Sequence, residues 1–460
     1  MTENLVEGRL ETIKDALSRQ NHRAIRLMFH KLASADISEI FEHLDPVQDV
    51  VLFRLVPIPK RTETFAFINH DRQREMLDLL PDAMVVRILN ELDPVDRTKL
   101  LEELPEAISE RFIQMLTPKE REIAQKILSY PEESVGRIMT PEFMAIRLGL
   151  SASQALEQIR WRAGSLSEHL LYNIFVVDSE GVYVGHLTLG ALITADPPRM
   201  LIDEIVQKNQ PGLSVLADEG EAVDAFRKYD ETCIPVTDEA GILVGVVEAD
   251  DVFDLAEEEA TEEMQQFGGH DPLEDSYFQT PIKDLVQKRA GWLAVLFVGM
   301  MFTADALEYF DESIKKWSYL VFFVPLIISS GGNSGSQAAS LMIRGLAVKE
   351  IEIGHWFKIF KRELLIGVLL GGILGVLGFL RASLYNGPVV GLVTATSLVG
   401  IVVFGTLIGS MLPFIMKRIG IDPAVSSSPV IASLVDFAGI IIFFKVAIFY
   451  LQTMGLEGGF

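Results

Sequence analysis

The sequence predicts a multidomain protein, with a cytosolic α-solenoid, a paired α/β module and an all-α transmembrane domain of five helices. Three observations carry this prediction. Proline-containing turns recur every 24 residues near the start of the chain, a strand-like repeat follows at an offset of 60 residues, and long apolar runs fill the chain from residue 291 onward. A chain of 460 residues is also too long for one hydrophobic core.

The charge is divided unevenly along the chain. Residues 1–290 hold 54 acidic and 29 basic residues, a net charge of −25, whereas the rest carries ten acids and eleven bases. A strongly acidic soluble part argues against nucleic acid, whose phosphates require clustered Lys and Arg, and favours cations. The amino terminus lacks the pattern of a cleaved signal peptide, so we expect this part to remain in the cytosol. The single cysteine, Cys233, excludes an intrachain disulfide and a thiolate zinc cluster, and we expect it to pack in a strand.

The solenoid prediction rests on two series of turns with the same period. Proline ends a helix at the residue before it, so the spacing indicates short paired helices. The first series is Asp45-Pro46, Asn69-His70, Asp93-Pro94 and Thr117-Pro118, and the second is Val56-Pro57, Leu80-Pro81 and Leu104-Pro105. Asp93 and Asp96 fall at one of these turns, where they serve either as cation ligands or as ordinary N-terminal helix caps.

The second repeat changes the expected secondary structure. Residues 173–193 superpose without a gap on residues 233–253, each copy showing a strand, an Asp-x-x-Gly turn, a second strand and the start of a helix. This pattern resembles the CBS-domain pair, a regulatory module, over about residues 138–258. Such pairs often bind adenine nucleotides through a Ser/Thr-x-x-Asp motif, but the first copy has Thr188 with Ala191 and the second has Glu248 with Asp251. Nucleotide binding is therefore doubtful.

Acidic residues crowd the second copy and the segment after it. Like charges four residues apart destabilise a helix, so either the run is a solvated face or something neutralises it. Divalent cations, which prefer oxygen ligands, would do so. The acids are Asp218, Asp230, Asp250, Asp251, Asp254, Glu257, Glu258, Glu259, Glu262 and Glu263.

Five apolar runs are long enough to cross a bilayer core of about 30 Å. They are 291–310, 319–344, 364–384, 389–416 and 430–451. Ten bases flank one side of these runs and three flank the other, which places the amino terminus in the cytosol and the carboxyl terminus outside. We therefore divide the chain into an acidic helical-repeat domain (1–132), a CBS pair (133–258), a connecting plug helix (259–289) and a transmembrane domain (290–460).

Polar residues inside the apolar runs mark a candidate ion path. Asp436 lies within the last run, where a carboxylate costs roughly 2.5 to 3.5 kcal/mol to insert and therefore usually faces a bundle interior or a water path. Asp422 precedes this run, near one membrane face. Glycines and Pro325 predict a broken second helix with Asn333 and Gln337 as its polar lining. The alternative is that these glycines only allow close helix crossing.

The segments GGNSGSQ and IDPAVSSSPVIASLVD, together with the domain order, resemble the MgtE family of magnesium channels over nearly the whole chain. The resemblance implies a homodimer whose pore lies at the twofold axis and is lined by the second and fifth helices. It implies that Asp436 holds a hydrated Mg²⁺, that Asp422 lies near the cytoplasmic mouth, and that Ser428 occupies a polar position of the pore. It also implies regulatory Mg²⁺ at acids matching Asp218, Asp230, Asp251, Asp254, Glu259 and Glu262.

The expected function is a Mg²⁺-selective channel for Mg²⁺ uptake across the plasma membrane, closed when cytosolic Mg²⁺ binds the acidic domains. We expect Asp93, Asp96, Asp250 and Glu258 to bind regulatory Mg²⁺ as well. The alternatives are a transporter for Co²⁺ or Mn²⁺, or one coupled to protons, and a membrane-anchored cation sensor that conducts nothing. An enzyme is not expected, because His355 lies in a loop and Asp305 and Glu308 sit near the outer end of the first helix.

Overall fold

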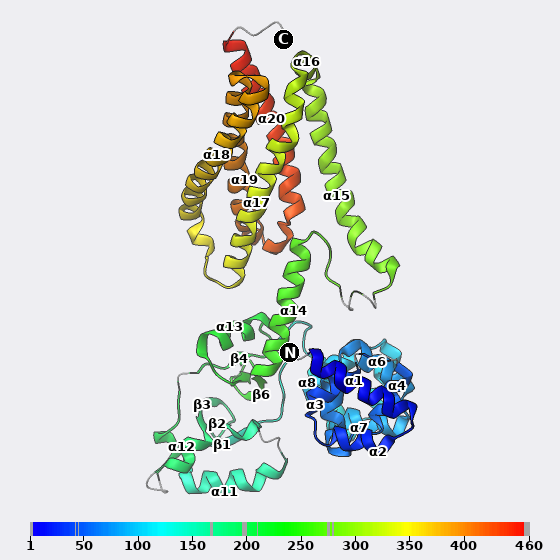
Figure 1. Cartoon of the computed structure of the whole chain (residues 1–460). Coiled ribbons are helices and arrows are strands. Elements are labelled where there is room, and N and C mark those ends of the chain that lie inside the picture. Colours follow the sequence, from blue (N-terminus) through cyan, green and yellow to red (C-terminus); the bar gives the residue numbers. More distant parts are fainter. Residues whose placement is uncertain are drawn as a thin grey trace. The chain divides into compact units, whose positions relative to one another are not determined.

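The computed structural model describes residues 3–41, 43–44, 46–165, 169–195, 200–208, 210–273, 277 and 280–454. Two compact units make up the chain, Met1–Glu258 and Glu259–Phe460, and each is described by itself (Figure 1). The division into an α-solenoid, an α/β pair and a helical carboxyl-terminal region is confirmed. The finer boundaries at 132, 258 and 289 stay a prediction.

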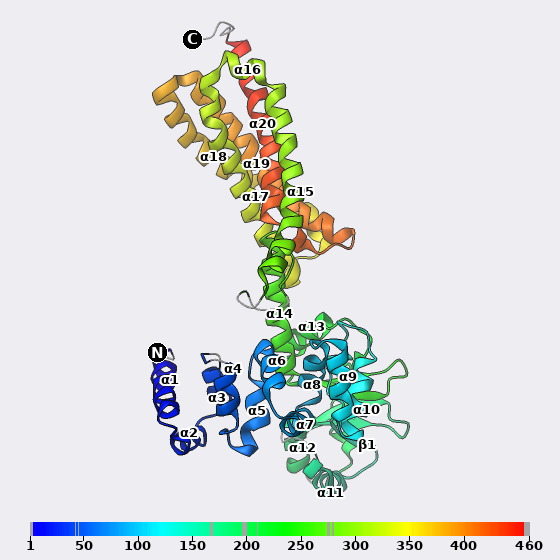
Figure 2. The same cartoon turned by 90° about the vertical axis from the view of Figure 1, so that its right-hand side faces the viewer.

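The first unit begins with ten α-helices that stack in chain order (Figure 2). The predicted period of 24 is confirmed, because α4, α6, α8 and α10 begin directly after the first series of turns and α7 and α9 after the second. Their bounds are α1 Glu3–Ser18, α2 His22–Phe29, α3 Ser34–Phe41, α4 Pro46–Phe53, α5 Arg61–Ala66, α6 His70–Leu79, α7 Asp82–Glu91, α8 Pro94–Glu102, α9 Glu106–Met115 and α10 Pro118–Leu128.

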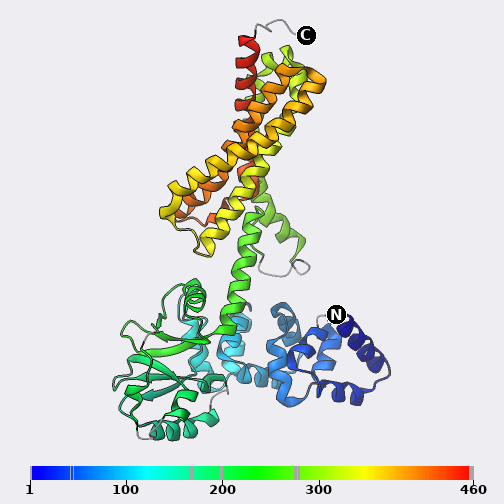
Figure 3. The ribbon, with the colours of Figure 1, turned by 60° about the vertical axis from the view of Figure 1, so that its left-hand side comes forward.

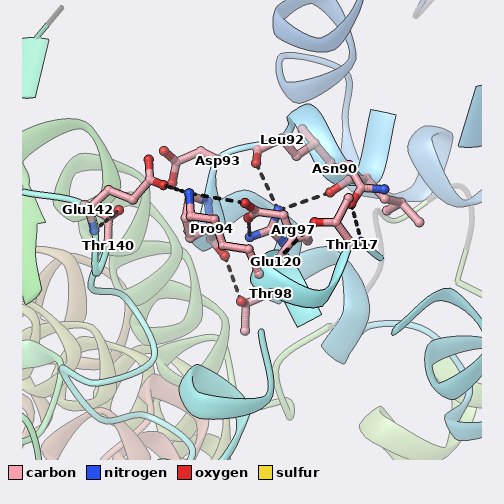
Figure 4. Close-up of polar contacts among 12 residues, drawn as sticks. Asn90, Leu92, Asp93, Pro94, Arg97, Thr98, Thr117, Glu120, Thr140 and Glu142 are labelled. Atoms are coloured by element: carbon pink, nitrogen blue, oxygen red, sulfur yellow. Dashed lines mark hydrogen bonds and ion pairs between the residues drawn. The ribbon is translucent and has the colours of Figure 1, made fainter. Parts of the chain in front are cut away.

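A polar contact repeats with the same period and ties each helix pair together. Gln73 Nε2 donates to Phe65 O at 2.7 Å, Arg97 Nη1 to Leu89 O at 3.2 Å, and Arg121 Nε to Ile113 O at 3.1 Å. Each donor thus satisfies a carbonyl near the end of the helix before it, where the backbone lacks intrahelical partners. Arg97 is fully buried and also donates to Glu120 at 2.7 Å (Figure 4).

The α/β part holds two three-stranded sheets that repeat the same topology, as predicted. In each sheet the first strand pairs parallel with the second, which pairs antiparallel with the third. Cys233 is buried in β5. The elements are β1 Met144–Arg147, α11 Ala152–Arg162, β2 Asn173–Val177, β3 Tyr183–Thr188, α12 Leu189–Thr194, β4 Leu213–Ser214, α13 Gly220–Tyr229, β5 Cys233–Thr237, β6 Leu243–Glu248 and α14 Ala249–Phe267.

The second unit is helical, and α17 to α20 pack side by side, with α18 (yellow) along α19 (orange) in Figure 3. In the described part of the chain, four helices are long and apolar enough to cross a membrane: α15, α18 with its preceding turn, α19 and α20. The second predicted span (319–344) corresponds to α17, a helix of 24 residues that is not among those four. The bounds are α15 Ile282–Tyr309, α16 Asp311–Lys316, α17 Val324–Ala347, α18 Trp356–Asn386, α19 Pro388–Arg418 and α20 Ser428–Thr453.

The predicted break in the second span is wrong, because α17 is one continuous helix. Pro325 lies in its first turn, where the missing N–H costs nothing. The glycines instead permit close packing against the neighbouring helix: a Cβ on Gly405 would collide with the Gly331 carbonyl, and one on Gly409 with the Gly335 carbonyl. Small residues at helix contacts are the usual means of close approach within membranes. The alternative interpretation of the glycines therefore holds.

The connector also differs from its prediction. We expected a connecting helix over residues 259–289, followed by a separate span from residue 291. Instead, residues 282–289 form the first two turns of α15, which runs unbroken from Ile282 to Tyr309. Gly291 lies within this helix with open space around it, so the single glycine does not interrupt the helix.

Candidate functional site

Asp436 lies on α20, two turns beyond the helix start, and is half-buried. Its preceding neighbour Val435 is fully buried against the Gly331 region of α17. Among the described residues Asp436 has no hydrogen bond or ion pair, and Lys445, nine residues along the helix, is exposed and does not pair with it. The Asp436 carboxylate is therefore left for a ligand.

The seam between α17 and α20 carries the other polar groups of the predicted path. Ser428 Oγ and Ser336 Oγ lie 2.8 Å apart, and one turn further the α-carbon of Gly332 faces Ala432. The two helices therefore run antiparallel here, and Asp436 follows one more turn along the same seam. Asn333 and Gln337 are exposed on α17, next to the residues that make this contact. The seam thus has one packed side and one open side bearing amide and carboxylate groups.

Asp422 has a local structural role as well. It is exposed, and its Oδ1 accepts a hydrogen bond from Ala424 N at 2.7 Å, capping the short 3₁₀ turn η7, Pro423–Val425. The turn joins α19 to α20. The second carboxylate oxygen remains available to a cation at this end of the bundle.

In the first unit, acids from two distant stretches of sequence converge on one cavity of about 270 Å³. Asp96 of α8 lines it, together with Asp251, Asp254 and Glu258 of α14. Lys99 also reaches the cavity and forms an ion pair with Glu258. Asp93 caps α8 by accepting from Val95 N at 3.0 Å, so the capping interpretation applies to Asp93.

Burial, and then the charges of neighbouring acids, raises the pKa values of three acids at the cavity. Burial, followed by the charges of Asp93, Asp250 and Asp254, raises the pKa of Asp96 to about 7. Burial, with Asp250 as the next cause, raises the pKa of Asp251 well above its usual range. The pKa of Asp254 is raised mainly by burial, although Lys99 opposes the shift. The cavity therefore disfavours several negative charges at once and favours a cation that would balance them.

The raised pKa of Asp96 predicts a pH-dependent stability in the absence of divalent ions. An acid whose pKa is higher in the folded state contributes fully to stability only at pH values below its ordinary pKa, here 3.8. This contribution is lost as the pH rises from there through about 7. In chelator, the stability of residues 1–258 with Asp96→Asn relative to wild type should therefore increase by roughly 2 kcal/mol between pH 5 and pH 8. Thermal unfolding at the two pH values measures this. A wild type as stable as the variant at pH 8 would contradict it.

Not every predicted regulatory acid lies at this cavity. Asp218 accepts from Gly220 N at 3.0 Å in a turn, and Asp230 ends α13 with a left-handed backbone. Glu259 and Glu262 lie on α14 within the second unit. In the described part of the chain no three acidic, His or Cys side chains form a ready group for direct metal coordination. The acids at the cavity fit an ion that keeps most of its waters, as Mg²⁺ does.

Sequence reasoning missed four further acids and both bases, Lys99 and Arg137, at the cavity. Glu102 and Glu133 are among them, and Arg137 forms an ion pair with Glu102. The other two acids are Glu132 and Glu219. They come from three separate segments with no shared motif, and the net charge of −25 before residue 291 is the one signal that could have pointed to them.

The positions of the nucleotide motif have other roles in the first copy. Thr188 Oγ1 caps α12 by accepting from Ala191 N at 3.2 Å. A separate cavity of about 340 Å³ is lined by residues of both copies, including Tyr172, Phe175, Cys233, Glu248 and Asp250. Its aromatic rings could stack on a flat base, whereas its two carboxylates would oppose phosphates.

Three family models match the chain. Residues 32–133 match the MgtE intracellular N domain, residues 135–197 and 211–258 match the CBS domain, and residues 324–446 match a divalent cation transporter model named MgtE. Together these matches cover the solenoid, the α/β pair and the helical bundle.

Curated relatives match over almost their whole length. The magnesium transporter MgtE of Thermus thermophilus is 33% identical over 446 residues, which cover 96% of this chain and 98% of the relative. The protein of the same name from Bacillus subtilis is 26% identical, covering 91% of this chain and 95% of the relative. A solved structure of the cytosolic domain of the Mg²⁺ channel MgtE in complex with ATP is 30% identical with a TM-score of 0.50, covering 54% of this chain and 99% of that one.

Proposed function

The chain belongs to the MgtE family of magnesium transporters, and on that premise we propose that it is a Mg²⁺-selective channel closed by cytosolic Mg²⁺. The observation that carries the proposal is Asp436, a half-buried carboxylate without a partner among the described residues, on the open side of the α17–α20 seam. A carboxylate held in an apolar helix is costly unless a cation or water path compensates it.

Mg²⁺ sheds its waters reluctantly, so a selective path needs one or two carboxylates and polar groups spaced to accept hydrogen bonds from the hydration shell. Asp436 supplies the charge, and Asn333, Gln337 and Ser428 supply polar groups along the seam, with Asp422 at its end. We propose that a homodimer brings two such seams to one axis, where a divalent ion balances two copies of Asp436.

Gating follows from the acidic cavity. When cytosolic Mg²⁺ is high, ions balance the acids on α8 and α14 and hold the solenoid against the CBS pair, which closes the pore. When it is low, repulsion among Asp96, Asp251 and their neighbours favours separation and opening. Because the ion binds the compact arrangement better, linkage requires that it shift the population toward that arrangement.

The protein belongs in a membrane, and the plasma membrane with the amino terminus inside is the proposed location. The bases Arg344, Lys358, Lys361 and Arg362 lie at the bundle end where α17 stops and α18 starts, as the positive-inside rule expects of a cytoplasmic face. Its family consists of transporters, and we propose no enzymatic reaction for it.

Two alternatives are kept. A transporter for Co²⁺ or Mn²⁺, with or without proton coupling, would use the same carboxylates, since these ions also accept oxygen ligands. A broken second span would have argued against a non-conducting sensor, but α17 is continuous and offers no such argument. The open polar seam beside Asp436 is what favours conduction over sensing.

The experiment that tests the proposal is Mg²⁺ entry into liposomes that contain the purified full chain, measured with an enclosed Mg²⁺-sensitive dye. We expect entry at low Mg²⁺ on the side of the soluble unit and little entry when Mg²⁺ there is high. Entry of Mn²⁺ in preference to Mg²⁺ would favour the first alternative, and no entry of any divalent ion would favour the sensor.

Neither copy has the complete Ser/Thr-x-x-Asp motif for nucleotide binding, although the cytosolic domain of one relative was solved in complex with ATP. If the aromatic cavity between the two copies accepts a nucleotide, the base and ribose must carry the affinity, because Glu248 and Asp250 oppose phosphates. We therefore expect adenosine to bind residues 1–258 at least as tightly as ATP in a calorimetric titration. Tight ATP binding with no adenosine binding would contradict this expectation.

A further inference from the structure

One end of the helical bundle carries a basic and aromatic surface that the ion path does not use. It lies where α17 ends and α18 begins, the yellow connection in Figures 1 and 3. The members of this surface, here called the basic collar, are Arg344, Trp356, Phe357, Lys358, Lys361 and Arg362. All six side chains are exposed.

Three bases of the basic collar, Lys358, Lys361 and Arg362, form no ion pair among the described residues. Of the nearby acids, Glu352 caps the turn before α18 through its side chain, and Glu363 is buried. At the opposite end, by contrast, Lys315 forms an ion pair with Asp311.

Aromatic rings accompany these bases at the depth where a headgroup layer would begin. Trp356 and Phe357 are each 51% exposed, with ring centroids 5.4 Å apart, and Lys361 Nζ lies 4.5 Å above the Phe357 ring. The continuous apolar part of α18 starts at Leu364, about 12 Å further along the helix. Trp and Phe rings beside Lys and Arg at the end of an apolar span suit the boundary between acyl chains and phosphates.

A small core lies beneath the basic collar and connects it to α17. Met342 and Leu346 of α17 pack with Phe414 of α19, and Ile351 and Ile359 cover this cluster from the connection and from α18. Ile351 also contacts Gly345 and donates its N–H to Gly345 O at 2.8 Å. A ligand held by α18 would therefore steady the end of α17.

We propose that the basic collar binds the phosphate headgroups of anionic phospholipids in the adjacent leaflet, and that the bound lipid stabilises the α17–α18 connection. Charge complementarity selects this occupant, because unpaired Lys and Arg directly outside an apolar span attract anionic lipids, at roughly 1 kcal/mol for each base near the surface. The proposal concerns lipid binding and does not depend on which ion the channel conducts.

The test uses the purified full chain in a mild detergent, with phosphatidylglycerol or phosphatidylcholine added and lipid retention counted by native mass spectrometry. The variant is Lys358→Gln/Lys361→Gln/Arg362→Gln. Its matched control, Lys315→Gln/Lys316→Gln/Arg381→Gln, removes three bases from the other end. We expect phosphatidylglycerol affinity to fall by roughly 10- to 100-fold in the first variant and to stay unchanged in the control.

Three further arms make the outcome decisive. The charge-keeping Lys358→Arg/Lys361→Arg variant should retain the lipid, and phosphatidylcholine should bind all proteins weakly. Inorganic phosphate at the same concentration should not displace the lipid. Equal retention of phosphatidylglycerol by the collar variant and the control would overturn the proposal, since these bases would then serve membrane orientation alone. Displacement by free phosphate would overturn the choice of a lipid as the occupant.

Discussion

Replacing Asp436 by alanine is expected to reduce Mg²⁺ entry into liposomes by roughly 10- to 100-fold, the largest effect of any single substitution in this chain. The carboxylate is the one acid within the apolar length of α20, and a charge-assisted contact to a hydrated ion is worth about 1.5 to 3 kcal/mol. Two copies on a dimer axis would increase the loss. Asp436→Asn should also lose conduction, because it keeps the shape and removes the charge.

The matched control for this prediction is Glu312→Ala, which removes an exposed carboxylate from α16 outside the apolar runs. It should conduct as wild type does. Conduction by Asp436→Ala equal to that of Glu312→Ala would remove Asp436 from the ion path. The proposed channel function would then need another carboxylate, and Asp422 would be examined next.

The second large effect is expected at the acidic cavity, in the response to cytosolic Mg²⁺ rather than in conduction itself. The double variant Asp96→Asn/Asp251→Asn removes two acids from the cavity. The pKa values of both are raised by burial and by neighbouring acids. Mg²⁺ then binds the compact and the separated arrangements with nearly equal affinity. The ratio of Mg²⁺ entry at low cytosolic Mg²⁺ to Mg²⁺ entry at high cytosolic Mg²⁺ should therefore fall toward one.

Two comparison variants sharpen this gating prediction. Glu106→Gln/Glu110→Gln removes two exposed acids from α9, and its Mg²⁺ response should match wild type. Lys99→Gln removes the ammonium that pairs with Glu258 inside the cavity, so more Mg²⁺ should be needed for closure. A double Asn variant that still closes fully at the wild-type Mg²⁺ concentration would exclude the cavity as the sensor.

The sequence alone was sufficient wherever structure follows from local chemistry. Proline and capping residues that recur every 24 residues determine where helices begin, because each acts on the backbone next to it. Asp93 and Thr117 do cap the helices that follow them. The match of residues 173–193 to residues 233–253 without a gap likewise predicted two sheets of the same topology. Asp436 could be singled out because a carboxylate in an apolar run is costly in any arrangement.

Tertiary structure decided what depends on partners far away in the chain. The glycines of α17 looked like a helix break, yet α17 is continuous and these glycines pack closely against Gly405 and Gly409 of α19, a neighbour that no local rule contains. The acidic cavity likewise exists only because α8 and α14 meet, which places Asp96 among acids more than 150 residues away. Secondary-structure propensity acts within a few residues, whereas packing and charge repulsion act between elements that lie far apart in the sequence. The acids could therefore be predicted from the sequence, and the cavity that they share could not.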